Sequence, residues 1–133
     1  MNDAIKEWGP IVGRVLLATI FLMSGLMKIG SFAGTSGYMA KMGVPLSDIA
    51  LVVTIIVEVG GAAMIIVGWK ARWGATALFL WMIPVSLMFH AFWAVPQDQM
   101  QTQMAMFLKN VSMMGAMLLI MAFGSGPKSL KAD

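Results

Sequence analysis

Five ionisable side chains stand inside otherwise apolar stretches of this sequence. A carboxylate and a histidine are the groups that most often accept and release protons near neutral pH, and a lysine ammonium attracts anions and carbonyl oxygens. An ionisable group surrounded by hydrocarbon is costly, so its presence points to a function. The five residues are Arg14, Lys28, Glu58, His90 and Lys109.

The elements that must carry these residues follow from composition. Of the 133 residues, 59% are hydrophobic and 11% are charged, whereas a soluble domain carries about 25% charged residues. A soluble domain is therefore excluded, and we expect a single membrane domain, an all-α integral membrane protein with a four-transmembrane-helix bundle. The expected spans are about 10–30, 47–69, 73–95 and 103–124, and residues 31–44 are expected to form an outer interfacial loop or short helix.

The distribution of basic residues predicts the orientation. Most lysines and arginines lie on the side of the membrane that also holds the two termini, and cytoplasmic loops carry an excess of such residues. Both termini are therefore expected in the cytoplasm. Tryptophan and tyrosine positions at the ends of the spans agree with this orientation. The net charge of +3 is accounted for by this topology, so no nucleic-acid partner is expected.

The depth of each ionisable residue follows from the rise of a helix, about 1.5 Å per residue. Counted from the start of the second span, Glu58 lies about 16 Å along its helix, near the bilayer midplane. His90 and Lys109 each lie about 8–9 Å below the outer surface. Lys28 ends the first span on the outer side, and Arg14 lies near the inner end of that span.

The absence of cysteine and the single histidine limit the cofactors that the chain can hold. There can be no disulfide, no Cys-ligated iron–sulfur cluster, no c-type haem attachment and no zinc site built on Cys and His. We therefore expect that the chain binds no metal and has no cofactor of its own. Fifteen methionines suggest a Cu(I) site, because thioethers select that ion. Methionine is also a common packing residue, and the sequence does not decide whether Met100, Met104 and Met106 bind copper.

The charged groups of the outer half have two interpretations. In the structural one, Glu58 pairs with Lys109 beside His90, while Arg14 and Lys28 snorkel to the two interfaces. In the functional one, Lys28 and Lys109 face a single carboxylate, which leaves excess positive charge in a closed pocket. An anionic ligand, a quinone carbonyl or a lipid phosphate would compensate that charge, and loss of the Lys109 proton by desolvation would also remove it.

Several short motifs resemble those of the DoxX family, and together they extend over residues 13–124. They are Gly13-Arg14, Gly25-x-x-Lys28, Phe32-Ala-Gly-Thr35…Tyr38…Gly43-x-Pro45, Glu58-x-Gly60-Gly61, Phe89-His90-x-Phe92-Trp93 and Phe107-Leu-Lys109-Asn110. The resemblance implies a multi-pass protein of a bacterial or archaeal inner membrane. It also implies a link to quinone-dependent oxidoreductases, because the family takes its name from a subunit associated with a quinol oxidase and with thiosulfate:quinone oxidoreductase.

Two functions are consistent with these observations. In the first, the chain is a membrane subunit or accessory protein of a quinone-linked oxidoreductase, in which His90 or Lys109 hydrogen-bonds a quinone carbonyl and Glu58 accepts a proton. In the second, it is a non-catalytic scaffold that stabilises other membrane proteins. Besides the lipid bilayer, the expected partners are other membrane or redox subunits or further copies of the chain. The candidate ligand-binding residues are Glu58, His90, Lys109, Lys28, Asn110 and Trp93, with Arg14 as a structural or lipid-facing charge.

Overall fold

The computed structural model describes residues 1–133, and nearly all of the regular structure in it is helical. Four helical segments are long and apolar enough to cross a membrane, so the predicted four-transmembrane-helix bundle is confirmed. The elements are α1 (Asp3–Gly30), α2 (Phe32–Lys41), α3 (Ser47–Ile55), η1 (Ile56–Gly60), α4 (Gly61–Val67), α5 (Ala71–Phe89), η2 (Phe92–Ala94) and α6 (Gln97–Phe123). The second span consists of α3, η1 and α4 in succession.

Two spans extend beyond their apolar stretches. α1 begins at Asp3 instead of about residue 10, because Asn2 accepts a hydrogen bond from the Ala4 amide at 2.8 Å and caps the helix. α6 begins at Gln97 instead of about residue 103, directly after Pro96, and Asp98 lies in its first turn, where a negative charge is favourable. Polar first turns therefore lengthen both helices past the hydrophobic segment that the composition identifies.

The apolar stretch predicts a continuous helix to Val95, but the helix of the third span ends before that residue. α5 ends at Phe89, His90 has non-helical dihedral angles of φ −127° and ψ 37°, and a short 3₁₀ turn follows. Pro96 forces the preceding Val95 into extended backbone at φ −109° and ψ 160°, and the aromatic residues before it are weak helix formers. The helix therefore ends inside the span, at Phe89, and His90 is its C-cap residue.

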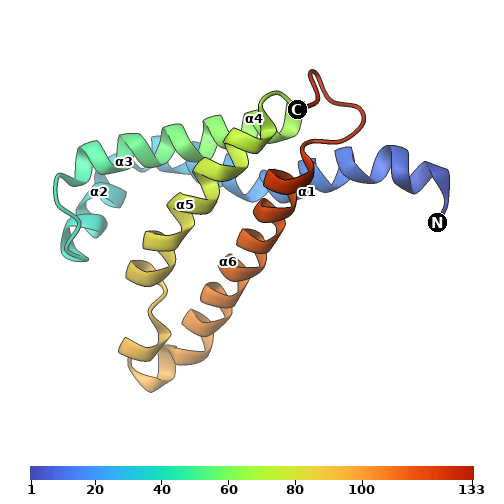
Figure 1. Ribbon diagram of the computed structural model, residues 1–133. Helices are drawn as coiled ribbons and strands as arrows, with labels where there is room; N and C mark the ends of the chain where they lie inside the picture. The colour runs from blue at the N-terminus through green and yellow to red at the C-terminus, as the bar shows by residue number, and fades with distance from the viewer.

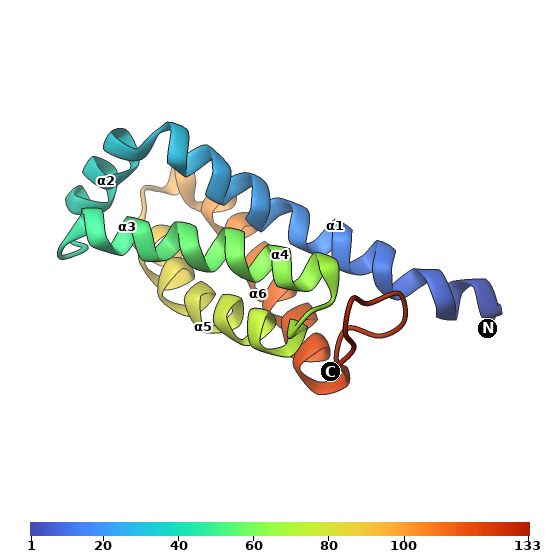
Figure 2. The same cartoon turned by 90° about the horizontal axis from the view of Figure 1, so that it is seen from above.

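The helices form two pairs that cross (Figure 1). α1 runs alongside the α3–η1–α4 span, and α5 runs alongside α6 (Figure 2). The C-terminal residues 124–133 fold back near the end of α4 and the start of α5 (Figures 1 and 2). α2 lies at the opposite end of the bundle, beside α1 and α3.

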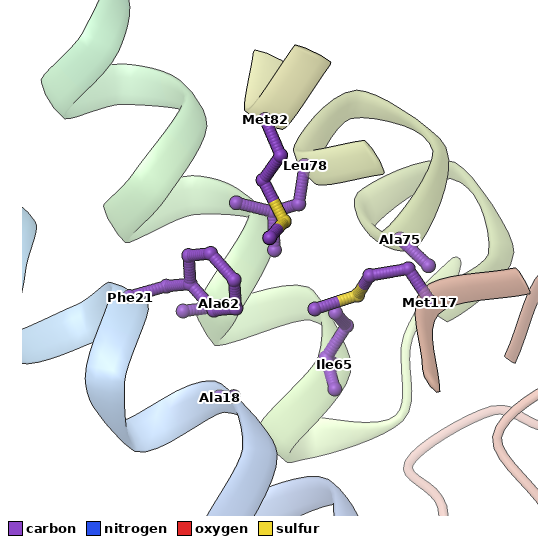
Figure 3. Packing of buried hydrophobic residues seen from close by; sticks show 8 residues of the cluster. All are labelled: Ala18, Phe21, Ala62, Ile65, Ala75, Leu78, Met82 and Met117. Carbon is purple, nitrogen blue, oxygen red and sulfur yellow. The ribbon is translucent and has the colours of Figure 1, made fainter. Parts of the chain in front are cut away.

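The apolar core lies where the four spans meet (Figure 3). Gly61 and Gly74 bring α4 and α5 into close contact there, because a Cβ on Gly74 would lie 3.0 Å from the Gly61 carbonyl oxygen. Small residues at helix contacts are typical of packing inside a membrane. The cluster comprises Ala18, Phe21, Ala62, Ile65, Ala75, Leu78, Met82 and Met117.

Candidate functional site

Lys28 and Glu58 form an ion pair inside the bundle. The Lys28 Nζ atom lies 3.0 Å from Glu58 Oε1 and 3.1 Å from Oε2, and it donates a further hydrogen bond to Ser24 Oγ at 2.6 Å. Glu58 is buried, with 7% of its surface exposed, whereas the Lys28 side chain is 25% exposed. Both carboxylate oxygens therefore accept hydrogen bonds from a single ammonium group, so opposite charges face each other in the apolar interior.

Gly25 allows α1 to approach the second span closely enough for this ion pair to form. A Cβ on Gly25 would lie 2.6 Å from Val59 Cγ2 and 3.2 Å from Glu58 Cβ, both closer than ordinary contact. Lys28 lies three residues after Gly25, on the same face of α1. In the Gly25-x-x-Lys28 motif, the glycine thus permits a close contact between two helices and the lysine places a charge at that contact.

Replacing Gly25 by alanine is expected to reduce stability by about 1 kcal/mol or more, because the added methyl group must push α1 away from η1. Thermal unfolding in detergent measures the loss. The matched control is Gly13→Ala on the same helix, where a Cβ would meet no atom within 4 Å. Equal melting temperatures for the two variants would contradict the close contact.

Two departures from α-helical geometry lie at the site. Glu58 is carried by η1, a π-turn within the second span, and His90 is the residue at which α5 ends. Single π-turns inside helices occur frequently at functional sites. Non-helical backbone at membrane depth is tolerated only where protein covers it or where it borders a cavity. Both irregular segments therefore mark the same region of the bundle as a site.

The His90 ring is oriented by α6. Its Nδ1 atom lies 2.9 Å from the side-chain oxygen of Gln103. Because an amide oxygen is an acceptor only, Nδ1 carries the hydrogen in this arrangement, and a neutral ring then presents Nε2 as an acceptor. His90 is half-buried, and its second nitrogen is available for a ligand or a proton.

Two cavities border the ion pair. The larger has a volume of about 260 Å³ and is also lined by residues of α2, including Tyr38. The smaller has a volume of about 160 Å³ and extends toward Asn110 on α6. The residues that line both cavities are Lys28, Glu58, Trp81, Val85 and His90.

The structure thus brings together four of the residues that the sequence nominated as ligand-binding candidates, namely Lys28, Glu58, His90 and Asn110. Asn110 is buried, and its side-chain nitrogen donates to Ser86 Oγ at 3.0 Å. This hydrogen bond links α6 to α5 beside the smaller cavity. Each of the four spans therefore contributes at least one polar group to the same region.

Lys109 does not belong to this group. It is exposed on α6, and its Nζ atom contacts only Met106 Sδ, at 3.4 Å. The expected pairing of Glu58 with Lys109 is wrong, because Lys28 takes that place. The expected excess of positive charge in a closed pocket is wrong for the same reason. Consecutive residues of a helix point in different directions, so Lys109 is exposed although Asn110, the next residue along α6, faces the interior of the bundle.

Trp93 also lies outside the cavities. It is 55% exposed and packs edge-on against Phe92 and Phe107, with ring centroids 5.1 and 5.6 Å away. Helical spacing would place Trp93 on the same face as Ser86 and His90, but α5 ends at Phe89 and does not continue to Trp93. Of the aromatic residues in the Phe89-His90-x-Phe92-Trp93 motif, Phe89 lines the larger cavity, whereas Phe92 and Trp93 do not.

Arg14 is buried, with 4% of its surface exposed, so it neither snorkels to the interface nor faces lipid. Its Nε donates to the Ile65 carbonyl of α4 at 3.0 Å. Its two terminal nitrogens donate to three carbonyls of the C-terminal segment, those of Ser125, Pro127 and Lys128, at 2.5, 3.1 and 3.0 Å. Arg14 therefore has a structural role and fastens the C-terminal segment to the inner end of the bundle.

Several cavity residues were not anticipated from the sequence. Trp81 lines both cavities, and its indole Nε1 is a buried donor without a hydrogen-bond partner. Tyr38 and Gln103 line the larger cavity. The spacing of Trp81, Val85 and Phe89 by four residues places them on one face of α5 and was the available signal for Trp81. Gln103 begins the fourth span expected from the sequence, but no pattern there indicated that its side chain faces His90.

Comparison with known proteins agrees with the residue pattern. The sequence matches the DoxX family over residues 9–91. The chain belongs to the DoxX family. The matched region contains the ion pair and His90, while Asn110 and Gln103 lie beyond it.

Two relatives of this family member come from Escherichia coli. Inner membrane protein YphA is 32% identical over 90% of this chain and 86% of its own length, and inner membrane protein YqjF is 34% identical over 95% and 92%. The Schizosaccharomyces pombe surfeit locus protein 4 homolog is 28% identical over 94% of this chain but only 37% of its own length. No solved structure matches the chain. With four spanning helices, this is an inner-membrane protein of the DoxX family that sits in a lipid bilayer.

Proposed function

We propose that the chain is a membrane subunit or accessory protein of a quinone-linked oxidoreductase system in a bacterial or archaeal inner membrane. In this proposal a quinone head group occupies the larger cavity beside the ion pair. The observation that carries it is the position of Lys28, Glu58 and His90 around one cavity of about 260 Å³ within the membrane-spanning part of the chain.

The polar groups around this cavity favour a ligand that accepts hydrogen bonds. Lys28 is a donor, Trp81 has a buried indole N–H without a partner, and Tyr38 carries a hydroxyl group. Both Glu58 oxygens already accept from Lys28. Carbonyl oxygens such as those of a quinone suit this set of donors. Phe89 and Tyr38, whose ring centroids are 5.8 Å apart, supply an aromatic wall.

Proton transfer in this site depends on the ion pair. When a quinol is oxidised it loses two electrons and two protons, so the electrons need an acceptor, which we assign to a redox centre of a partner subunit. Each Glu58 oxygen accepts one hydrogen bond from Lys28 and keeps a further lone pair, so the carboxylate can accept a hydrogen bond from a quinol hydroxyl and then its proton. A ligand oxygen that draws Lys28 toward itself would free the carboxylate, and His90 Nε2 offers a second acceptor beside it.

Quinone binding by the purified protein tests the proposal. Glu58→Gln and His90→Ala are each expected to weaken the binding of ubiquinol about tenfold, because the quinol hydroxyl groups donate to the Glu58 carboxylate and to His90 Nε2. A hydrogen bond contributes about 0.5–1.5 kcal/mol, or about 1.5–3 kcal/mol when one group is charged. Trp93→Phe is the matched control, since Trp93 lines neither cavity, and its affinity should equal that of the unaltered protein. Unchanged affinity in both site variants, with folding confirmed by gel filtration, would refute a quinone site here.

A second function, that of a non-catalytic scaffold for other membrane proteins, is favoured by the surface of α6. Only Asn110 and Met117 of this helix are buried, and Lys109 lies exposed on it without a charged partner. A partner helix that brings a carboxylate to Lys109 would remove the cost of that exposed charge. Purification without a tag distinguishes the two functions: a stoichiometric redox enzyme supports the first, and a homo-oligomer without cofactor supports the second.

A further inference from the structure

A groove on the outside of α1 reaches the ion pair from the lipid side. It has a volume of about 400 Å³ and runs along α1 to the start of α2. Its apolar lining is formed by Ile20, Met23 and Met27, of which Met23 and Met27 are 52% and 67% exposed. Because these residues lie within a membrane-spanning helix, the open side of the groove faces acyl chains.

The groove adjoins the interior cavities, because several residues line both. Lys28 and Thr35 line both the groove and the larger cavity. Lys28, Ser24 and Ile20 line both the groove and the smaller cavity. Lys28 is the one residue common to all three spaces, so its side chain borders the groove while its ammonium group bonds Glu58.

The polar residues of the groove are satisfied by one another. Ser31 Oγ lies 3.0 Å from the Met27 carbonyl oxygen, to which it donates, and 3.1 Å from Thr35 Oγ1. Lys28 is turned inward, where Ser24 and Glu58 hold its ammonium group. Binding of an apolar molecule in the groove would therefore leave few polar groups of the protein without a hydrogen-bond partner.

The sizes of the spaces indicate what belongs in each. Ligand pockets commonly measure about 300–1,000 Å³, and the larger cavity, at about 260 Å³, lies below that range. It can take a ring-sized polar head but not a long apolar tail as well. A tail attached to such a head must leave the cavity, and the groove begins at the residues that separate the two.

We propose that this groove is the lateral entrance and tail site for an amphipathic, membrane-dissolved ligand, with Lys28 as the gate. The inference rests on the proposed function and specifies the ligand further: an acceptor-bearing head carried on a long apolar chain. The head passes between α1 and α2, Lys28 turns from Glu58 to the head, and the chain remains in the groove against Met23 and Met27.

Equilibrium binding in lipid nanodiscs tests the tail site with two probes, ubiquinone with a long isoprenoid tail and the same head group without a tail. Met27→Trp fills the groove without altering a residue of either cavity. It is expected to weaken binding of the long-tailed probe about tenfold or more, an effect of about 1.4 kcal/mol, and to leave binding of the tailless probe unchanged. Ile29→Trp, on an exposed position of α1 outside the groove, should bind both probes as the unaltered protein does.

The possible outcomes separate the two proposals. If the unaltered protein binds the quinone and Met27→Trp binds each probe as tightly as the unaltered protein does, the tail site and the entrance inferred from it are wrong and the proposed function stands. Equal weakening of both probes also overturns the tail site, because the substitution then acts on the head. Met23→Trp fills the same groove and provides a second variant should Met27→Trp fail to fold. If the folded, unaltered protein binds neither probe, both proposals fail.

Discussion

Glu58→Gln is expected to lower the free energy of unfolding by about 3 kcal/mol, because it leaves the Lys28 ammonium without its counter-charge in the interior. Glu58 is the sole carboxylate bonded to Lys28, and the remaining contact, to Ser24 Oγ, is neutral. Lys28 is 25% exposed at its side chain and can turn partly outward, which places the expected loss at the lower end of the range for broken buried pairs. Thermal or denaturant unfolding in detergent measures the loss.

The double variant Lys28→Met/Glu58→Gln is the matched control. It removes both charges together and keeps side chains of similar size, so it should recover most of the stability that Glu58→Gln loses. The coupling between the two sites is then the difference between the double variant and the sum of the two single variants. Additive losses would show that the two residues contribute independently and that the ion pair has no stabilising role.

Composition and the spacing of apolar stretches were sufficient to predict the fold class. Low charge and four apolar stretches lead to four spans because a bilayer admits only helices or closed barrels. The break at His90 could not be predicted from the apolar pattern, since an apolar stretch looks the same whether or not its backbone is helical. Pro96 was the local signal that a helix must end before it.

The residues of the candidate site could be predicted from the sequence only in part. Ionisable residues in the spans identified Lys28, Glu58 and His90, but sequence alone could not decide which lysine pairs with Glu58. That choice depends on how each helix is rotated and how closely two helices approach. Gly25 permits the close approach of α1 to η1, whereas the rotation of α6 turns Asn110 inward and leaves Lys109 outside.

The irregular backbone and the polar groups of the site support one another. A π-turn inserts an extra residue into the second span at Glu58, and the end of α5 frees the backbone at His90. Each departure from the α-helix costs hydrogen bonds in a membrane. Such costs are retained where they serve a site, and the two interior cavities lie between these segments and share their polar residues. The π-turn and the early end of α5 therefore both lie beside the groups able to bind a ligand.

Arg14→Gln is expected to release the C-terminal segment from the bundle and to lower the free energy of unfolding by about 3 kcal/mol. The guanidinium donates to four carbonyls, those of Ile65, Ser125, Pro127 and Lys128, and a hydrogen bond to a charged group contributes about 1.5–3 kcal/mol. Glutamine is shorter and can reach only part of this set. Carbonyls near the interface recover some hydrogen bonding from water, which keeps the expected loss below the full sum.

Hydrogen exchange gives this prediction a local measurement. The amides of Leu130 and Lys131 donate to the carbonyls of Val67 and Gly68 at 2.8 and 3.0 Å, so they should be protected in the unaltered protein and exchange freely in Arg14→Gln. Glu7→Gln is the matched control, because Glu7 forms an exposed ion pair with Lys128 of the same segment, and such pairs contribute at most about 1 kcal/mol. Protection that persists in Arg14→Gln would show that the segment is held by its backbone bonds to α4 alone. Loss of protection in that variant only, with Glu7→Gln unchanged, would assign the closure of the inner end of the bundle to the buried arginine.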